Sequence, residues 1–384
     1  MSAPIRIDLK AIETIPSRRT EAWKYSDLRR WVRDEPPLSP ALLQGEPNDG
    51  PFNTLTTNEV LIANGRLNWW SEDSLEAGVE VVRHAGPDAP RMADEMPMGA
   101  LAAAKALEGV CIISFKAGEP RSIALRLLSD AVKTGHHARI GLLVEAGAHA
   151  TVLESHEGWG EAYLSNTLIE FLVDEGATLE RIVLIEEPHD AISVTSAEVH
   201  LSKNATYRQT IVATGARLQR LETRIAHAGE GATVRMDGLY VLNGERHVDL
   251  TSVVDHRGPD GATSQLIKGV ARDTARGVFQ GKIVVERGAD GTDARMGHHA
   301  LIASERAEID AKPELIIYAD DVQCAHGNTV GTLDESALFY MQQRGIPAEE
   351  ARALLTQAFL IEVIDRIEHE GAREVAREWL TARL

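Results

Sequence analysis

A short turn of the form Gly-Ala or Asn-Ala recurs through the middle of the chain at spacings of 27 to 30 residues. Glycine and asparagine readily adopt the left-handed backbone conformation that a tight corner needs, and alanine keeps the corner narrow. The turns are Gly147-Ala148, Gly176-Ala177, Asn204-Ala205, Gly231-Ala232, Gly261-Ala262 and Gly288-Ala289. Segments rich in Thr, Val and Ile follow several of them, which is typical of strands. The repeat therefore predicts a stack of similar units made of strands and corners.

The length of this repeat separates the possible β architectures. A propeller blade usually repeats at about 40 residues or more, which is too long. A β-solenoid coil of about 20–30 residues, built from two or three short strands joined at corners, fits the spacing. We therefore predict a mainly β chain whose core, residues 110–332, is a right-handed parallel β-helix. A run of ordinary hairpins is the alternative.

Residues 1–109 are expected to form a helical and mixed N-terminal region. Residues 17–33 have the pattern of an amphipathic helix, with Trp23 and Trp31 as its apolar anchors. A segment rich in Pro and Gly follows and predicts a loop. Asn64-Gly65 indicates a hairpin, and an Ala-rich helix is expected over residues 98–108.

Residues 333–384 are expected to form a helical C-terminal domain, because the apolar period changes to that of a helix. Thr332 and Glu335 have the spacing of a capping box, and Gly345 is expected to end the first helix. Pro347 is then expected to open a longer helix that ends near residue 370. We expect these helices to cap the solenoid, since the last coil would otherwise expose its strand edges.

The charge of the chain restricts its partners. Its 384 residues include 40 Lys and Arg and 58 Asp and Glu, a formal net charge of −18. Such a chain repels phosphate backbones and anionic lipids, so neither nucleic acid nor a membrane is expected as a partner. The sequence contains neither an apolar run of about 18 residues nor a signal peptide pattern, so the cytoplasm is the expected compartment.

The chain has two cysteines, Cys111 and Cys324, far apart in the sequence. This excludes a disulfide framework, and Cys111 is expected in the core. Two thiolates are too few for a metal centre that needs four sulfur ligands. Any such centre bound here would therefore be shared with another chain, use nitrogen or oxygen ligands, or be transient.

Cys324-Ala325-His326 is the strongest candidate site. Side chains alternate across a strand, so the thiol and the imidazole are expected on one side, where they could bind a metal together. The alternative is a cysteine that packs as a small hydrophobic residue beside a structural histidine. Asp320, Asp321 and Glu314 could add oxygen ligands, although general burial statistics favour a solvated acidic turn. His298 and His299 are adjacent, so they are expected to face opposite sides.

Several motifs of self-sufficient enzymes are absent from the sequence. It has no phosphate-binding loop, no Cys-x-x-Cys pair and no nucleophile elbow. We therefore expect a non-catalytic protein. A rival interpretation is a β-helix enzyme that acts on acidic polysaccharide, for which Arg217, Arg220, Arg224 and Lys203 would be the nearest candidates.

Four segments resemble those of a known family. Residues 19–28 read R-T-E-A-W-K-Y-S-D-L, residues 277–283 read G-V-F-Q-G-K-I, and residues 301–312 read L-I-A-S-E-R-A-E-I-D-A-K. The fourth, residues 310–346, includes C-A-H-G and a helix start. Together they resemble the SufB/SufD family of iron–sulfur cluster assembly scaffold proteins. The few cysteines and the C-A-H-G sequence are similar to the SufD branch.

The resemblance implies a function for the candidate site and for the tail. His326 would face a cysteine of a SufB-like scaffold, and a transient iron–sulfur cluster would be shared between the two chains. The C-terminal helices, with the apolar residues Leu338, Phe339, Tyr340 and Phe359, would dock a SufC-like ATPase. The family is also associated with reduced flavin, and a homodimer is expected of the isolated chain. A purely structural partner subunit without a metal role is a further alternative.

Overall fold

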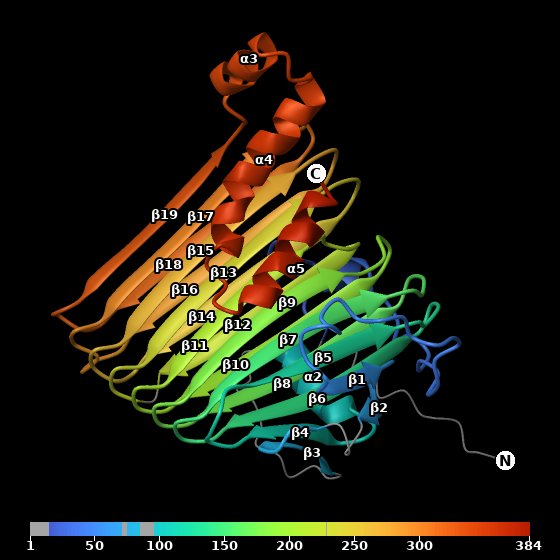
Figure 1. Cartoon of the computed structure of the whole chain (residues 1–384), viewed down its shortest axis with the longest axis vertical. Coiled ribbons are helices and arrows are strands. Elements are labelled where there is room, and N and C mark those ends of the chain that lie inside the picture. Colours follow the sequence, from blue (N-terminus) through green and yellow to red (C-terminus); the bar gives the residue numbers. More distant parts are fainter. Residues whose placement is uncertain (1–14, 71–74, 85–95, 228) are drawn as a thin grey trace.

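The computed structural model describes residues 15–70, 75–84, 96–227 and 229–384. Two large sheets face each other, one of ten strands and one of nine. From β4 to β19, consecutive strands alternate between the two sheets, and neighbours within each sheet are parallel. The chain is therefore a parallel β-solenoid of about eight turns with two strands in each turn (Figure 1). This confirms the solenoid and excludes a run of hairpins.

The strands of the ten-stranded sheet are, in spatial order, β19 (Gln323–Gly331), β17 (Asp293–Ile302), β15 (Ala262–Ala271), β13 (Thr233–Leu242), β11 (Thr206–Ala213), β9 (Thr178–Glu186), β7 (His149–Gly158), β5 (Arg121–Ser129), β1 (Glu59–Ala63) and β2 (Arg66–Trp70). Those of the nine-stranded sheet are β18 (Glu308–Ile317), β16 (Arg276–Val285), β14 (His247–His256), β12 (Leu218–His227), β10 (Ile192–Leu201), β8 (Leu164–Val173), β6 (Gly135–Val144), β4 (Val110–Phe115) and β3 (Val79–His84). Antiparallel pairing of β2 with β1 and of β3 with β4 finishes the N-terminal end of the stack.

The recurring turns lie at the corners that lead from the nine-stranded to the ten-stranded sheet. Left-handed backbone occurs at Gly147 (φ 71°), Gly176 (φ 64°), Asn204 (φ 55°), Gly231 (φ 67°) and Gly288 (φ 85°). The alanine that follows each of these residues is fully buried beneath its corner. At the remaining corner the left-handed residue is Asp260 (φ 58°), one position before Gly261. The repeated turns in the sequence therefore mark the corners of the solenoid, where the left-handed backbone conformation restricts which side chains are tolerated.

Gly160 lies at a corner of the other kind, between β7 and β8. A Cβ atom there would lie 1.8 Å from the carbonyl oxygen of Ala131 and 2.7 Å from its carbonyl carbon. Backbone atoms cannot rotate away, so Gly160→Ala is expected to lower the free energy of unfolding by about 3 kcal/mol. Gly331→Ala is the matched control, because nothing lies within 4 Å of its Cβ position. Equal urea denaturation midpoints for the two variants would contradict this prediction.

Both faces of the ten-stranded sheet are apolar where helices cover it. In β13, Tyr240 and Leu242 point into the solenoid, whereas Leu239 and Val241 point outward. The outward residues pack against α4 (Ala348–Ile364) and α5 (Glu370–Thr381), whose buried residues include Leu360 and Leu380. In Figure 1 these two helices lie along the outer face of the sheet. The expectation that they cap the end of the solenoid was therefore wrong.

The remaining helices differ in detail from the expected ones. Residues 17–33 contain two short 3-10 helices, Glu21–Trp23 and Leu28–Arg30, in place of one amphipathic helix. The helix α2 (Pro97–Lys105) occurs where the Ala-rich segment predicts it and packs on the nine-stranded sheet. The helix α3 (Glu335–Gln343) begins at Asp334, whose carboxylate accepts hydrogen bonds from two backbone N–H groups. Asp334 is therefore the N-cap, where the sequence suggested Thr332.

Candidate functional site at the open end of the solenoid

The C-terminal end of the stack has no closing strand within the described part of the chain. The last strands are β19 in one sheet and β18 in the other, and each has a hydrogen-bonded neighbour on one side only. Residues of β19 are exposed along nearly its whole length. Ile317, Tyr318 and Val330 add large apolar side chains that are 42%, 56% and 44% exposed. Such edges present unpaired backbone N–H and C=O groups that a further strand can meet.

Cys324 and His326 lie on one face of β19, as the alternation of side chains predicts. In the register between β17 and β19, Cys324 pairs with Ala294 and His326 pairs with Met296. Ala294 and Met296 belong to the inner core, so the two candidate residues face the interior of the solenoid. Cys324 packs partly against this core, whereas His326 is exposed. The thiol and the imidazole thus lie on the inner face of the open end.

The Cys324 side chain is a thiol rather than a thiolate at neutral pH. Partial burial raises its pKa above the ordinary value, and the negative charge of Asp293 raises it further. A hydrogen bond from the backbone of Ala294 opposes this shift. Binding of a soft metal ion would therefore have to displace a proton from the sulfur atom.

The three acidic residues that the sequence offers as oxygen ligands do not lie together in the structure. Asp320 and Asp321 are exposed in the turn between β18 and β19. Glu314 lines a groove of about 650 Å³ on the nine-stranded sheet, where its carboxylate lies 3.3 Å from Nζ of Lys312. Among the described residues, no group of three or more His, Cys, Asp or Glu side chains is arranged to hold a metal ion.

His298 and His299 face opposite sides of β17, as expected from their adjacency. Nδ1 of His299 forms a hydrogen bond with Oγ1 of Thr329, at a distance of 2.7 Å. His298 is 1% exposed, and its ring stacks on Phe279 at a centroid distance of 5.0 Å. Burial lowers the pKa of His298 to about 4, although the hydrogen bond to Asn328 opposes the shift. The imidazole of His298 is therefore neutral at physiological pH.

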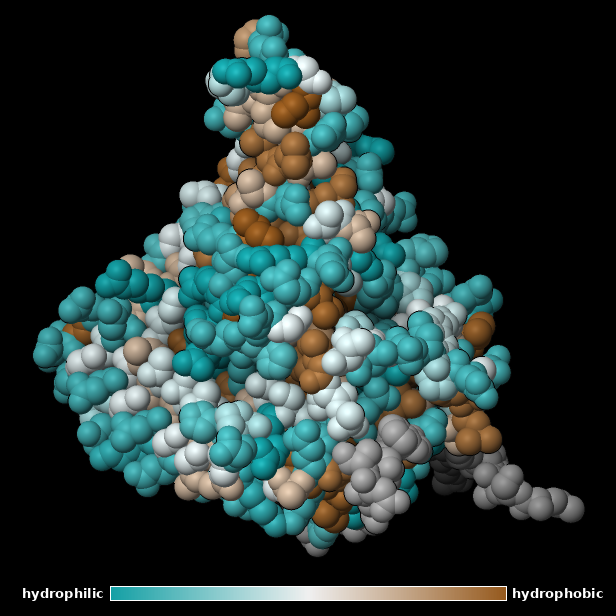
Figure 2. Space-filling view, viewed as in Figure 1, coloured by the Kyte–Doolittle hydropathy of each residue, from teal (hydrophilic) through white to brown (hydrophobic). Residues whose placement is uncertain are grey.

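The expected partner surface of the C-terminal helices is partly exposed. Phe339 and Tyr340 of α3 are 64% and 59% exposed, and Leu354 of α4 is 42% exposed. Figure 2 shows apolar side chains on this protruding part of the molecule. Leu338, in contrast, is buried within the chain. Phe359 is half-buried, and Nζ of Lys268 lies 4.6 Å from its ring centroid.

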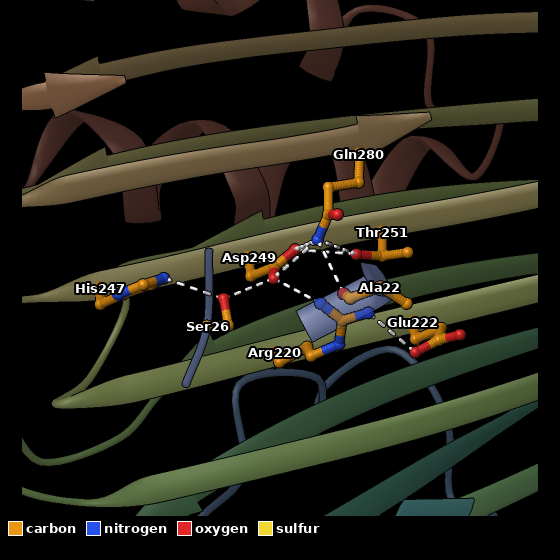
Figure 3. Close-up of polar contacts among 8 residues, drawn as sticks. All are labelled: Ala22, Ser26, Arg220, Glu222, His247, Asp249, Thr251 and Gln280. Carbon is orange, nitrogen blue, oxygen red and sulfur yellow. Dashed lines mark hydrogen bonds and ion pairs between the residues drawn. The ribbon is translucent and has the colours of Figure 1, made fainter. Parts of the chain in front are cut away.

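A buried polar network on the nine-stranded sheet binds the N-terminal segment, and sequence reasoning missed it. Asp249 accepts hydrogen bonds from Oγ of Ser26 and from Nη1 of Arg220, each at 2.5 Å (Figure 3). Nη2 of Arg220 lies 2.9 Å from Oε2 of Glu222, and its guanidinium carbon lies 4.3 Å from the ring centroid of Trp23. These contacts fix residues 20–28 on the sheet. They also leave Arg220 fully buried, so it is not available to bind a saccharide.

Comparison with known families agrees with this architecture. The family described as SUF system FeS cluster assembly, SufBD core domain, matches residues 127–359, which is more than half of the chain. The chain therefore belongs to the SufBD core family. Within the described residues, none of the helices has the length and apolar character that a membrane-spanning segment requires.

Individual relatives are similar over most or part of the chain. The iron–sulfur cluster assembly protein SufD of Escherichia coli is 28% identical over 94% of this chain and 87% of its own length. Protein ABCI7, chloroplastic, of Arabidopsis thaliana is 33% identical over 62% of this chain and 51% of its own length. The SufD protein of Bacillus subtilis is 28% identical over 64% of this chain and 67% of its own. The similarity to the Escherichia coli protein thus extends beyond the core domain into both flanking regions.

Proposed function

We propose that this chain is a non-catalytic, SufD-like scaffold subunit of iron–sulfur cluster assembly in the cytoplasm. Its open end would pair with a SufB-like scaffold chain, and a transient cluster would form between the two chains. The observation that supports this most strongly is the position of His326, exposed beside unpaired strand edges. A neutral imidazole there would donate a lone pair to iron while a thiolate of the partner supplied sulfur.

The unpaired edges of β18 and β19 determine how the partner chain would bind. Main-chain groups of β18 and β19 would bond to strands of the partner, as in β-strand addition generally. Exposed apolar residues such as Tyr318 and Val330 would then be covered by the partner chain. The same edges would allow a homodimer when the chain is isolated, since an open sheet edge also accepts an identical strand.

A second surface would dock a SufC-like ATPase. Phe339 and Tyr340 project from α3, which lies beyond the last strand, and Leu354 of α4 is exposed nearby. Exposed aromatic residues on a protruding helix are typical of a protein interface. Nucleotide-driven movement of the ATPase could reach the open end through α3, because α3 follows β19 directly along the chain.

Co-purification with the SufB-like and SufC-like proteins of the same organism tests both surfaces. Val330→Asp is expected to remove the SufB-like chain and to leave the ATPase bound, since it places a charge on the inner face of β19. Phe339→Asp is expected to have the opposite effect, so each variant is the control for the other. Retention of both partners by both variants would contradict the proposal.

A further inference from the structure

Behind the candidate site lies a chain of hydrogen bonds from Tyr240 through His298 to Asn328. Oη of Tyr240 lies 3.1 Å from Nε2 of His298, and Nδ1 of His298 lies 2.7 Å from Oδ1 of Asn328. Tyr240 belongs to the inner core and is fully buried. Asn328 pairs with His298 in the register between β19 and β17. The chain therefore connects the core of the solenoid with its open end.

The direction of these hydrogen bonds follows from the chemistry of the three groups. The amide oxygen of Asn328 can only accept, so Nδ1 of His298 carries the proton and donates to it. A neutral imidazole then has its lone pair at Nε2, which accepts a hydrogen bond from the hydroxyl of Tyr240. The amide oxygen is therefore occupied. Among the described residues, the amide nitrogen of Asn328 has no hydrogen-bond partner.

The free amide group lies close to the exposed imidazole. Cys324, His326 and Asn328 are alternate residues of β19, so they share its inner face. Alternate residues of a strand are about 7 Å apart. A metal-bound atom one or two bonds beyond the imidazole would therefore come within reach of the two N–H groups. Two fixed donors favour an anion, and at a site that receives iron and sulfur the anion is a sulfide or a thiolate.

We propose that Asn328 donates hydrogen bonds to an anionic sulfur atom bound at His326, and that Tyr240 and His298 are positioning residues that fix its amide. This inference rests on the function proposed above. Hydrogen bonds to sulfur stabilise negative charge on cluster sulfides and adjust their redox potential. Fixing the amide in advance also reduces the conformational entropy that sulfur binding would otherwise cost.

Nitrogen NMR of the isolated, metal-free chain tests the orientation of the network. The long-range proton–nitrogen correlations of His298 are expected to show a protonated Nδ1 and an unprotonated Nε2. Tyr240→Phe removes the donor to Nε2 and is expected to change the nitrogen shifts of His298 while leaving the fold intact. A wild-type spectrum with the proton on Nε2 would overturn the inference, because Asn328 would then donate to His298.

Cluster retention tests the role of the free donors. The complex with the SufB-like and SufC-like proteins is incubated with ferrous iron and sulfide, and bound iron and acid-labile sulfide are measured after gel filtration. Asn328→Ala and Asn328→Asp are expected to lower the retained cluster about tenfold, as removal of outer-shell partners does in other metal sites. Thr329→Ala, on the other face of β19, is the matched control and is expected to retain the wild-type amount of cluster.

Unchanged retention by both Asn328 variants would overturn the inference, whatever His326→Ala does. Unchanged retention by His326→Ala would overturn the proposed function instead. Thermal unfolding of each variant separates loss of the site from loss of the fold. Asn328→Asp keeps an acceptor for Nδ1 of His298 and is expected to melt close to the wild type, whereas Asn328→Ala leaves that buried nitrogen without its partner and is expected to melt at a lower temperature while still folding.

Discussion

Acidification from pH 7 to pH 5 is expected to remove a large part of the stability of this protein. Burial lowers the pKa of His136 to about 3 and of His137, His247, His256 and His298 to about 4. Unfolding exposes these rings to water, where the ordinary pKa is about 6.5. Between pH 6.5 and 4 the unfolded chain therefore binds more protons than the folded chain, and the free energy of unfolding falls as the pH falls.

The free energy of unfolding is expected to depend steeply on pH. Each of these histidines contributes at most about 1.4 kcal/mol per pH unit in that interval, against a total stability of about 5–15 kcal/mol for a typical domain. Asp237 acts in the opposite direction, because burial raises its pKa to about 6 in spite of Arg366 and Arg235, but it is a single group. Urea denaturation at pH 7, 6 and 5 measures the slope. A free energy of unfolding that stays constant over this range would contradict the account.

The variant His136→Gln shows whether the histidines cause this slope. His136 is 4% exposed and accepts or donates hydrogen bonds with Ser39 and Ser129. Removing its titration is expected to make the pH dependence measurably shallower. His200→Gln is the contrasting variant, because the hydrogen bond to Glu198 raises the pKa of the half-exposed His200, so its loss is not expected to make the pH dependence shallower.

Arg181→Met is expected to lower the free energy of unfolding by about 3–5 kcal/mol, because it removes the buried cation that compensates the charge of Glu154 and leaves only His156 bonded to that carboxylate. Both side chains are fully buried, and Nε and Nη2 of Arg181 lie 2.7 and 2.8 Å from the two oxygens of Glu154. Burial by itself would raise the pKa of Glu154, but Arg181 and His156 lower it to about 2. The carboxylate is thus ionised in the folded chain and depends on its partners.

A double variant distinguishes the loss of charge compensation from the loss of packing. Arg181→Met combined with Glu154→Leu removes both charges and is expected to be more stable than Arg181→Met alone, since a buried ion pair can often be replaced by apolar residues. Lys203→Met is the exposed control, because Lys203 and Glu230 are both about half-exposed and such pairs contribute about 0–1 kcal/mol. A loss below about 1 kcal/mol for Arg181→Met would contradict the prediction.

The solenoid could be predicted from sequence because its corners restrict residue type. Gly147 and Asn204 adopt left-handed backbone, which few residues tolerate, so their spacing directly reports the length of one turn. The hairpin at Asn64-Gly65 was predictable for the same reason, with φ values of 46° and 77°. The position of α4 and α5 on the outer face of the ten-stranded sheet could not be predicted from the sequence. The run Leu239-Tyr240-Val241-Leu242 does indicate a strand covered on both faces, but it does not say what covers the outer one.

The candidate site was predictable only in part. The alternation of side chains was enough to place Cys324 and His326 on one face, and the register with Ala294 and Met296 confirms it. Contacts between distant strands were not accessible from one sequence. His298 and Asn328 are 30 residues apart, and Ser26 and Asp249 are 223 residues apart. The burial of His136 and His156 in their strands could not be predicted either, because short polar patterns do not reveal which face a neighbouring segment covers.

The most direct test of the proposed function is the amount of iron and acid-labile sulfide retained by the assembled complex when His326 is replaced by alanine. His299→Ala is the matched control, because His299 lies on the opposite face of a neighbouring strand and bonds to Thr329. We expect that His326→Ala complexes form normally but retain little iron or sulfide, while His299→Ala complexes retain wild-type amounts. Equal retention by the two variants would contradict a role for the open end of the solenoid in cluster assembly.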